Sequence, residues 1–128
     1  MPSLVGAGPR AEWRPPADLL EFGEEFLVEL IADFVKATQH VLAEIASCYQ
    51  RGQMSGIKAQ AHRLKGSALQ LEATGLAAIC SEIETAAGAN SEFDLVEALK
   101  RLEVECALVR RDMSVFTGAA IPQDGSPA

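Results

Sequence analysis

Four segments of the chain carry apolar residues at alternating spacings of three and four, the repeat that puts side chains on one face of an α-helix. They cover residues 24–51, 57–71, 76–87 and 95–116, and the connections near 52–55, 72–74 and 88–91 are short. Short connections favour antiparallel neighbours. The spacing therefore predicts an all-α fold, an antiparallel up-down four-helix bundle, with Gly23 splitting off a short leading N-terminal helix.

The two ends of the chain lack this spacing. Residues 1–15 and 119–128 are rich in Gly, Pro, Ala and Ser. We therefore expect a flexible leader over residues 1–17, the bundle over 18–116 and a flexible C-terminal tail over 117–128. Trp13 is the exception, because a lone tryptophan in such a leader either pins it to the bundle or stays loose with it.

Length and charge narrow the classes of partner. A chain of 128 residues fits one domain, and its formal net charge of −7 argues against general nucleic-acid binding and anionic membranes. No apolar run approaches a membrane span and no signal-type segment is visible, so we expect a cytoplasmic protein. The charge is uneven, since residues 51–65 hold four bases and no acid.

Signatures of catalysis and of metal binding are missing from the sequence. There is no phosphate-binding glycine loop, no G-x-S-x-G and no H-E-x-x-H, and the two histidines, His40 and His62, lie far apart. Cys48, Cys80 and Cys106 are too widely spaced for a zinc site, and we interpret them as buried free thiols. We expect no metal and no cofactor.

The second apolar segment contains the one cluster that suggests chemistry. His62 lies one position off the apolar row, and its neighbours on the same helix face are Lys58, Lys65 and Gly66. The two lysines disfavour a protonated imidazole and could neutralise a phosphoryl group attached to it. Glycine inside a helix costs about 1 kcal/mol relative to alanine, so Gly66 suggests space for an approaching group. On spacing alone, His62 could equally be an ordinary boundary histidine on a solvated face.

The segment HRLKGSALQLEATGLAAICSEIE resembles the histidine phosphotransfer (HPt) family. The motif of that family, His-x-Leu-Lys-Gly-Ser/Ala followed by a Leu-x-x-x-Cys-x-x-Leu/Ile-Glu helix, falls on a set of matching positions. The resemblance covers roughly residues 18–116. The positions are His62, Leu64, Lys65, Gly66, Ser67, Ala68, Leu71, Leu76, Cys80, Ile83 and Glu84.

The resemblance implies a role for each of these site residues. His62 would be phosphorylated, Lys65 would neutralise the phosphoryl group, and Gly66 would leave room for the partner. Lys58, Arg63, Ser67 and Gln70 would support the site. The partners would be receiver domains of a hybrid sensor kinase and of a response regulator, which supply the aspartate and Mg²⁺, so the chain would carry phosphate without being an enzyme.

Two positions depart from the pattern of the family. Glu72 stands where the family usually has glycine, and because glutamate adopts a positive φ less readily, we expect a differently shaped turn there. Arg63 stands where small or hydroxyl residues are common and adds charge beside His62. Neither change removes a residue that phosphotransfer needs.

Three questions stay open at the level of sequence. Leu69, Phe22 and Phe26 either line a docking surface for a receiver or belong to the core. A helical adapter without phosphotransfer is the main alternative function, and an enzyme of unknown type is a remote one. We expect a monomer, because the apolar rows can all be used internally.

Overall fold

The computed structural model describes residues 10–117, and within that range it contains five helices and no strand. This confirms the all-α prediction. The predicted tail lies outside the described residues apart from Thr117. The helices are α1 (Ala17–Leu20), α2 (Glu24–Gln50), α3 (Met54–Gln70), α4 (Thr74–Gly88) and α5 (Glu92–Thr117).

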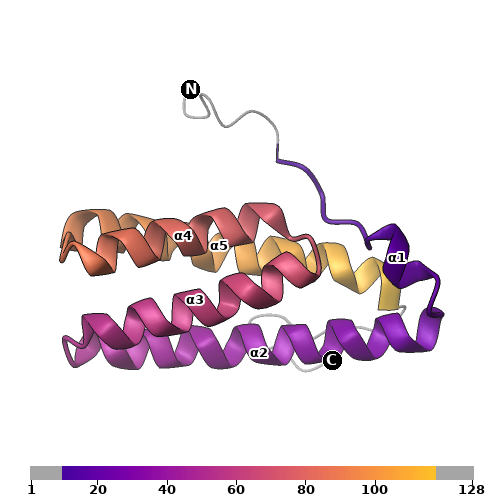
Figure 1. Cartoon of the computed structure of the whole chain (residues 1–128), viewed down its shortest axis with the longest axis horizontal. Coiled ribbons are helices and arrows are strands. Elements are labelled where there is room, and N and C mark those ends of the chain that lie inside the picture. Colours follow the sequence, from indigo (N-terminus) through magenta and orange to yellow (C-terminus); the bar gives the residue numbers. More distant parts are fainter. Residues whose placement is uncertain (1–9, 118–128) are drawn as a thin grey trace.

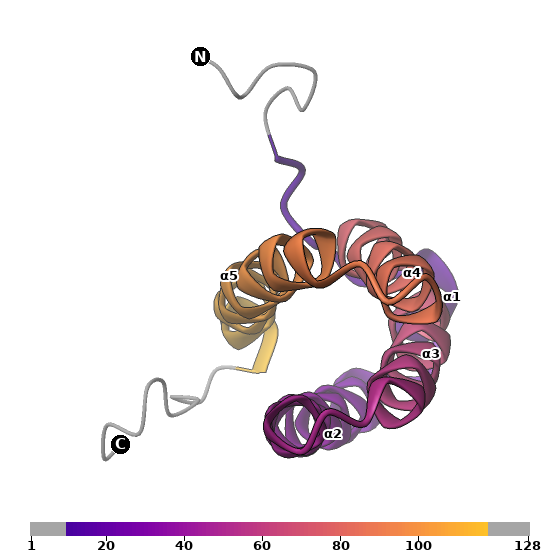
Figure 2. The same cartoon turned by 90° about the vertical axis from the view of Figure 1, so that its left-hand side faces the viewer.

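The four longer helices lie side by side, joined by three-residue connections at 51–53, 71–73 and 89–91 (Figure 1). Each contacts the next along the chain, and α2 also contacts α5 (Figure 2). Among the described residues, no Cα atom of α3 lies within 8 Å of one of α5, so these two helices are not direct neighbours. None of the described helices is long and apolar enough to cross a membrane.

The apolar rows predicted from the sequence meet in one core. Burying a large aliphatic side chain contributes roughly 1.5–3 kcal/mol, so these rows hold the helices together. All three cysteines are free and buried, as predicted. Burial raises the pKa of the Cys80 and Cys106 thiols to about 12, so neither is a reactive thiolate. The largest fully buried side chains are Ile31, Ile57, Leu64, Leu76, Ile83, Leu95, Leu102, Met113 and Cys80.

The turn after α3 forces Glu72 into a left-handed backbone conformation. Its φ is +56°, and the amide N–H of Ala73 donates to the carbonyl of Ala68 at 2.8 Å. The same pattern ends α2 and α4, where Gly52 and Asn90 occupy the left-handed position. The expectation of a different turn shape was wrong: Glu72 adopts the positive φ because the hydrogen bonds that close α3 require it.

Replacing Glu72 with glycine should therefore stabilise the protein. A left-handed conformation costs a residue with a Cβ about 1–2 kcal/mol, and glycine avoids this cost. Part of the gain is lost because glycine also increases the conformational entropy of the unfolded chain. We expect a net increase of about 1 kcal/mol in the free energy of unfolding, measured by urea denaturation. Glu72→Ala keeps the Cβ and is the matched control; a similar gain from alanine would contradict this explanation.

Of the predicted flexible leader, residues 1–9 lie outside the described residues, residues 10–16 pack against the helices, and Ala17 begins α1. The Trp13 side chain is 6% exposed, and its Nε1–H donates to the carbonyl of Leu71 at 2.7 Å. Its backbone N–H donates to Asp112, and its ring meets Phe116 edge-on at 5.8 Å. Arg10 pairs with Glu105 and Asp112 at 3.0 and 2.9 Å. Trp13 thus pins the segment 10–16, because the free energy gained by burying the indole exceeds the conformational entropy lost when this short segment is ordered.

Candidate functional site

His62 projects into solvent from the middle of α3. Its side chain is 71% exposed, although Ala61 and Leu64 on the same helix are buried in the core. The position one residue off the apolar row allowed a place at the core boundary or at the surface, and the structure has His62 at the surface. An imidazole this exposed can be reached by another protein without any movement of the helices.

A carboxylate on α4 orients the His62 ring. His62 Nδ1 lies 3.3 Å from Glu84 Oε1, and the Nζ of Lys65 lies 3.1 Å from Glu84 Oε2. The Glu84 side chain is 17% exposed, so it forms a fixed bridge between the two α3 residues. In the tautomer whose Nδ1–H donates to Glu84, the Nε2 atom keeps its lone pair.

The electrostatics of this triad favour an ionised Glu84. Partial burial alone would raise the pKa of Glu84, but the hydrogen bonds and charges of Lys65 and then His62 outweigh it. They hold the pKa of Glu84 below its ordinary value. At neutral pH the carboxylate therefore stays charged, accepts from the ring and anchors the Lys65 ammonium beside it.

The other residues expected to support the site fall into two groups. Lys58 reaches toward α4, where a Cβ added to Gly88 would lie 3.6 Å from Nζ, and Arg63 is exposed. Ser67 and Gln70 instead line a groove of about 180 Å³ between α3 and α2, together with Leu30 and Asp33. Lys65 and His62 thus both contact Glu84, which links them. Ser67 and Gln70 lie on the side of α3 that faces α2.

Gly66 meets open space. A Cβ added at this position would have no neighbour within 4 Å, and the residue is exposed inside a regular helix turn. Packing within the protein therefore does not require glycine here. The absence of a side chain matters only for something that approaches from outside.

The three apolar residues of the predicted docking surface are exposed, so they do not belong to the core. Leu69 lies on α3 two turns beyond His62, whereas Phe22 and Phe26 lie around the start of α2. The Phe22 and Phe26 rings pack on each other with centroids 5.1 Å apart. Exposed apolar side chains of this kind are typical of a surface that meets another protein.

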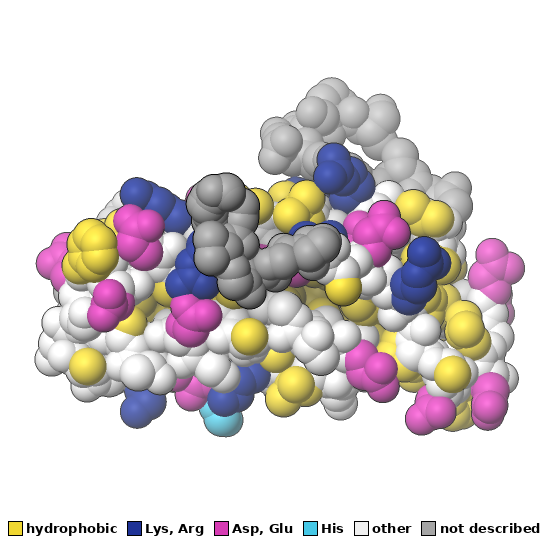
Figure 3. Space-filling view, turned by 90° about the horizontal axis from the view of Figure 1, so that it is seen from above, with side chains coloured by type: hydrophobic (Ala, Val, Ile, Leu, Met, Phe, Trp, Pro, Cys, Tyr) yellow, Lys and Arg dark blue, Asp and Glu magenta, His cyan; other side chains and the backbone are white. Residues whose placement is uncertain are grey.

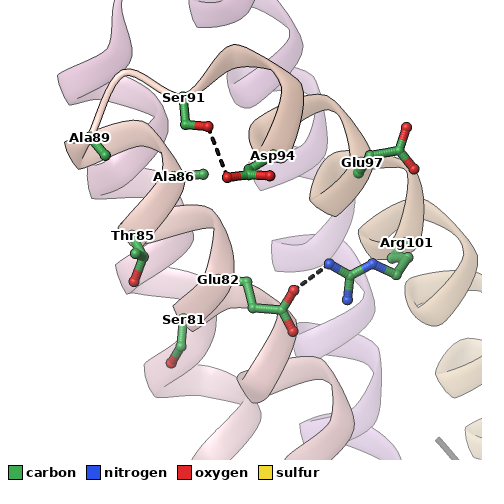
Figure 4. Close-up of a pocket in the computed structure, with 9 residues that line it drawn as sticks. All are labelled: Ser81, Glu82, Thr85, Ala86, Ala89, Ser91, Asp94, Glu97 and Arg101. Atoms are coloured by element: carbon green, nitrogen blue, oxygen red, sulfur yellow. Dashed lines mark hydrogen bonds and ion pairs between the residues drawn. The ribbon is translucent and has the colours of Figure 1, made fainter. Parts of the chain in front are cut away.

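One hollow of the described residues lies away from His62. It has a volume of about 430 Å³ between α4 and α5, with the side chains of Glu82 and Arg101 pointing toward one another across it (Figure 4). Ser91 donates to Asp94 at its upper end. These groups satisfy each other: Glu82 pairs with Arg101, and Ser91, which precedes α5, donates to Asp94 in the first turn of that helix. The candidate site is thus an exposed ridge on α3, which suits a protein partner better than a small molecule.

Comparison with known proteins identifies the family. A family model described as the Hpt domain matches residues 29–112, which include His62, Lys65, Gly66 and Glu84. The chain belongs to the Hpt family. Hpt domains are phosphocarrier modules of phosphorelays that interact with receiver domains, which accounts for an exposed histidine without a catalytic cleft. No curated protein and no solved structure matched the chain.

Glu84 is the site residue whose contact the sequence interpretation missed. It appears in the family motif, but the residues alone gave it no role. The helix-neighbour rule relates positions three and four apart on one helix, and Glu84 reaches His62 from the next helix. A signal was present in the sequence: Cys80, Ile83 and Ala87 mark the buried face of α4, and Glu84 borders that face.

Proposed function

We propose that the chain is a four-helix-bundle phosphorelay carrier that accepts a phosphoryl group on His62 and passes it to a receiver domain. The observation that carries this proposal is the triad of His62, Glu84 and Lys65 on an accessible ridge. Transfer would proceed between receiver domains of a hybrid sensor kinase and a response regulator, in the cytoplasm.

The geometry suggests how the transfer works. The Nε2 lone pair of His62 attacks the phosphorus of a receiver aspartyl phosphate, so that an N–P bond forms while the aspartate oxygen leaves as a carboxylate. Glu84 holds the Nδ1 proton and stabilises the positive charge that develops on the ring. Lys65 offsets the charge of the bound phosphoryl group, close to two negative charges at neutral pH. The reverse reaction follows the same path.

Docking would bring the receiver onto the α3 ridge. Gly66 leaves the ring approachable from the C-terminal side of α3. Leu69, Phe22 and Phe26 would provide apolar contacts, and Lys58 and Arg63 a basic rim. Ser67 and Gln70 would border the contact where the groove between α2 and α3 opens. Apolar contacts surrounded by charge give an interface that forms and dissociates quickly.

The test is intact-mass spectrometry after incubation with a phosphorylated receiver and Mg²⁺, with His62→Gln in parallel. We expect the wild type to gain one phosphoryl group that is labile to acid and stable to base, and the variant to gain none. His40→Gln is the matched control and should behave as wild type. If phosphoramidate also fails to phosphorylate the folded wild type, the carrier proposal is wrong. The alternative function, a helical adapter without phosphotransfer, is then favoured.

Gly66→Ala should separate the stability of α3 from access to His62. Because a Cβ there meets nothing, alanine should raise the free energy of unfolding by up to about 1 kcal/mol. The same Cβ would obstruct a docked receiver, so we expect phosphotransfer from the receiver to slow at least about tenfold. Phosphorylation by phosphoramidate should stay at the wild-type rate. Equal slowing with both donors would show that the methyl group disturbs His62 itself.

A further inference from the structure

The outer side of α5 carries apolar residues that the protein does not bury. Phe93, Val104 and Val115 are 77%, 61% and 75% exposed. They follow one another at intervals of eleven residues, or about three helical turns, so they lie on one line along the helix. This line is opposite the buried row that contains Leu95 and Leu102. We call the line of Phe93, Val104 and Val115, with the charged residues Glu97, Lys100 and Arg111 on the same side of the helix, the α5 stripe.

Charged residues alternate with the apolar ones along the α5 stripe. Glu97, Lys100 and Arg111 are exposed on the same side of the helix. Glu97 and Lys100 form an ion pair at 3.5 Å within the helix, whereas Arg111 makes no ion pair with any residue in the range 10–117. Arg101, at the border of the stripe, is already paired with Glu82. Arg111 is thus the cation of the stripe that is available to a partner.

The apolar residues of the α5 stripe, and the charges of Glu97 and Arg111, pair with one another when the stripe is read in the opposite direction. If two copies of α5 lie antiparallel with Val104 opposite Val104, then position 93 faces 115 and position 97 faces 111. Phe93 of one copy would thus meet Val115 of the other, and Glu97 would meet Arg111, twice each by symmetry. A second copy matches this order at the apolar positions and at the Glu97–Arg111 pairs, which favours a second copy over an unrelated helix.

We propose that the chain forms a two-fold symmetric dimer through antiparallel pairing of the α5 stripes. The expectation of a monomer assumed that every apolar row is used internally, and the α5 stripe is a row that is not. On the side formed by α4 and α5, hydrophobic side chains are exposed among acidic and basic ones (Figure 3). From position 93 to position 115 the paired helices would run side by side for roughly 33 Å.

This dimer would leave both phosphorylation sites accessible. The outward side of α3, which carries His62, and the outward side of α5 point in different directions (Figure 2), and the two helices are not direct neighbours. A receiver could then dock on each copy at once. The pairing does not depend on phosphotransfer, so its test is independent of the proposed function.

The first experiment is sedimentation equilibrium of the full chain up to about 1 mM, a range that detects even weak association. We expect the mass to rise with concentration from 13.6 kDa toward twice that value. Val104→Glu places two carboxylates together at the symmetry axis and should raise the dissociation constant at least about tenfold. Its helical circular dichroism should be unchanged, because the side chain is exposed. Ala43→Glu, at an exposed position of α2, is the control outside the stripe.

A charge exchange tests the antiparallel order. Glu97→Arg places an arginine opposite Arg111 and should weaken the dimer, whereas Glu97→Arg combined with Arg111→Glu should restore it. A monomer at all concentrations overturns the proposal. So does a dimer that Val104→Glu leaves intact, because its interface then lies elsewhere. A dimer that the double exchange fails to restore overturns the antiparallel pairing.

Discussion

Replacing Lys65 with alanine should slow phosphotransfer to His62 by roughly a hundredfold, the loss typical when one preorganised charge partner is removed from a transfer site. The Lys65 ammonium lies 3.1 Å from Glu84, which itself contacts the His62 ring. Removing the ammonium takes away the cation that offsets the phosphoryl charge. It also leaves the largely buried Glu84 carboxylate without its closest counter-ion. The negative charge of that carboxylate would then repel the incoming phosphoryl group.

The measurement is single-turnover transfer from a phosphorylated receiver, with the fold checked by circular dichroism. Lys65→Arg keeps the charge and should retain most of the rate. Lys36→Ala removes a cation from α2 and is the matched control for net charge. Transfer by Lys65→Ala at the wild-type rate would show that Lys65 is only a structural partner of Glu84.

A double variant separates the two contributions of Lys65. If the lysine acts mainly by neutralising Glu84, then adding Glu84→Gln to Lys65→Ala should restore most of the lost rate. If it acts mainly on the phosphoryl group, the second change should restore little, because the phosphate would still lack a cation. We expect partial recovery, less than about tenfold, because Glu84→Gln also removes the charge that stabilises the ring.

The helices were predictable because their signal is local. The apolar spacing placed the first long helix at residues 24–51, and the structure has α2 at Glu24–Gln50. The same spacing put His62 off the buried row, at the core boundary or at the surface, and the structure has it exposed. Residues on one helix, such as His62 and Lys65, could therefore be placed relative to each other before any tertiary contact was known.

What the sequence left open depends on how the helices pack together. The contact between Glu84 and His62 joins two helices, and spacing along one helix does not determine their relative rotation. The same rotation decides whether Leu69 is buried, and it is exposed. The exposure of Phe93 and Val115 was not predicted for a related reason. Hydrophobicity indicates that a side chain tends to be buried, but not whether it is buried within this chain or against a second copy.

Replacing Trp13 with alanine should lower the free energy of unfolding by about 3 kcal/mol, at the lower end of the range for buried aromatic residues. The lower end is expected because the segment 10–16 can detach and so avoid leaving a cavity. The indole loses its packing on Phe116 and its hydrogen bond to the carbonyl of Leu71. For a domain of this size, the melting temperature should fall by about 10 °C.

Two variants divide this loss into its parts. Trp13→Phe keeps most of the packing and removes the hydrogen bond to Leu71, so it should cost about 1–2 kcal/mol. Arg10→Ala removes two ion pairs near the surface and should cost at most about 1 kcal/mol. Trp13 is the only tryptophan, so in the Arg10 variant its fluorescence reports directly whether the segment is still docked. If Arg10→Ala proved as costly as Trp13→Ala, the ion pairs rather than the indole would hold the segment.

The loss of Trp13 should leave the phosphorylation chemistry intact. The indole supports Leu71, nine residues beyond His62 and roughly 14 Å along the helix axis. Between them, Leu64 and Ala68 remain buried against the core, so α3 should unravel only at its last turn. We therefore expect faster amide hydrogen exchange at residues 72 and 73, with phosphoramidate labelling of His62 unchanged below the melting temperature. Loss of labelling together with stability would instead mean that the segment 10–16 holds the whole of α3 in place.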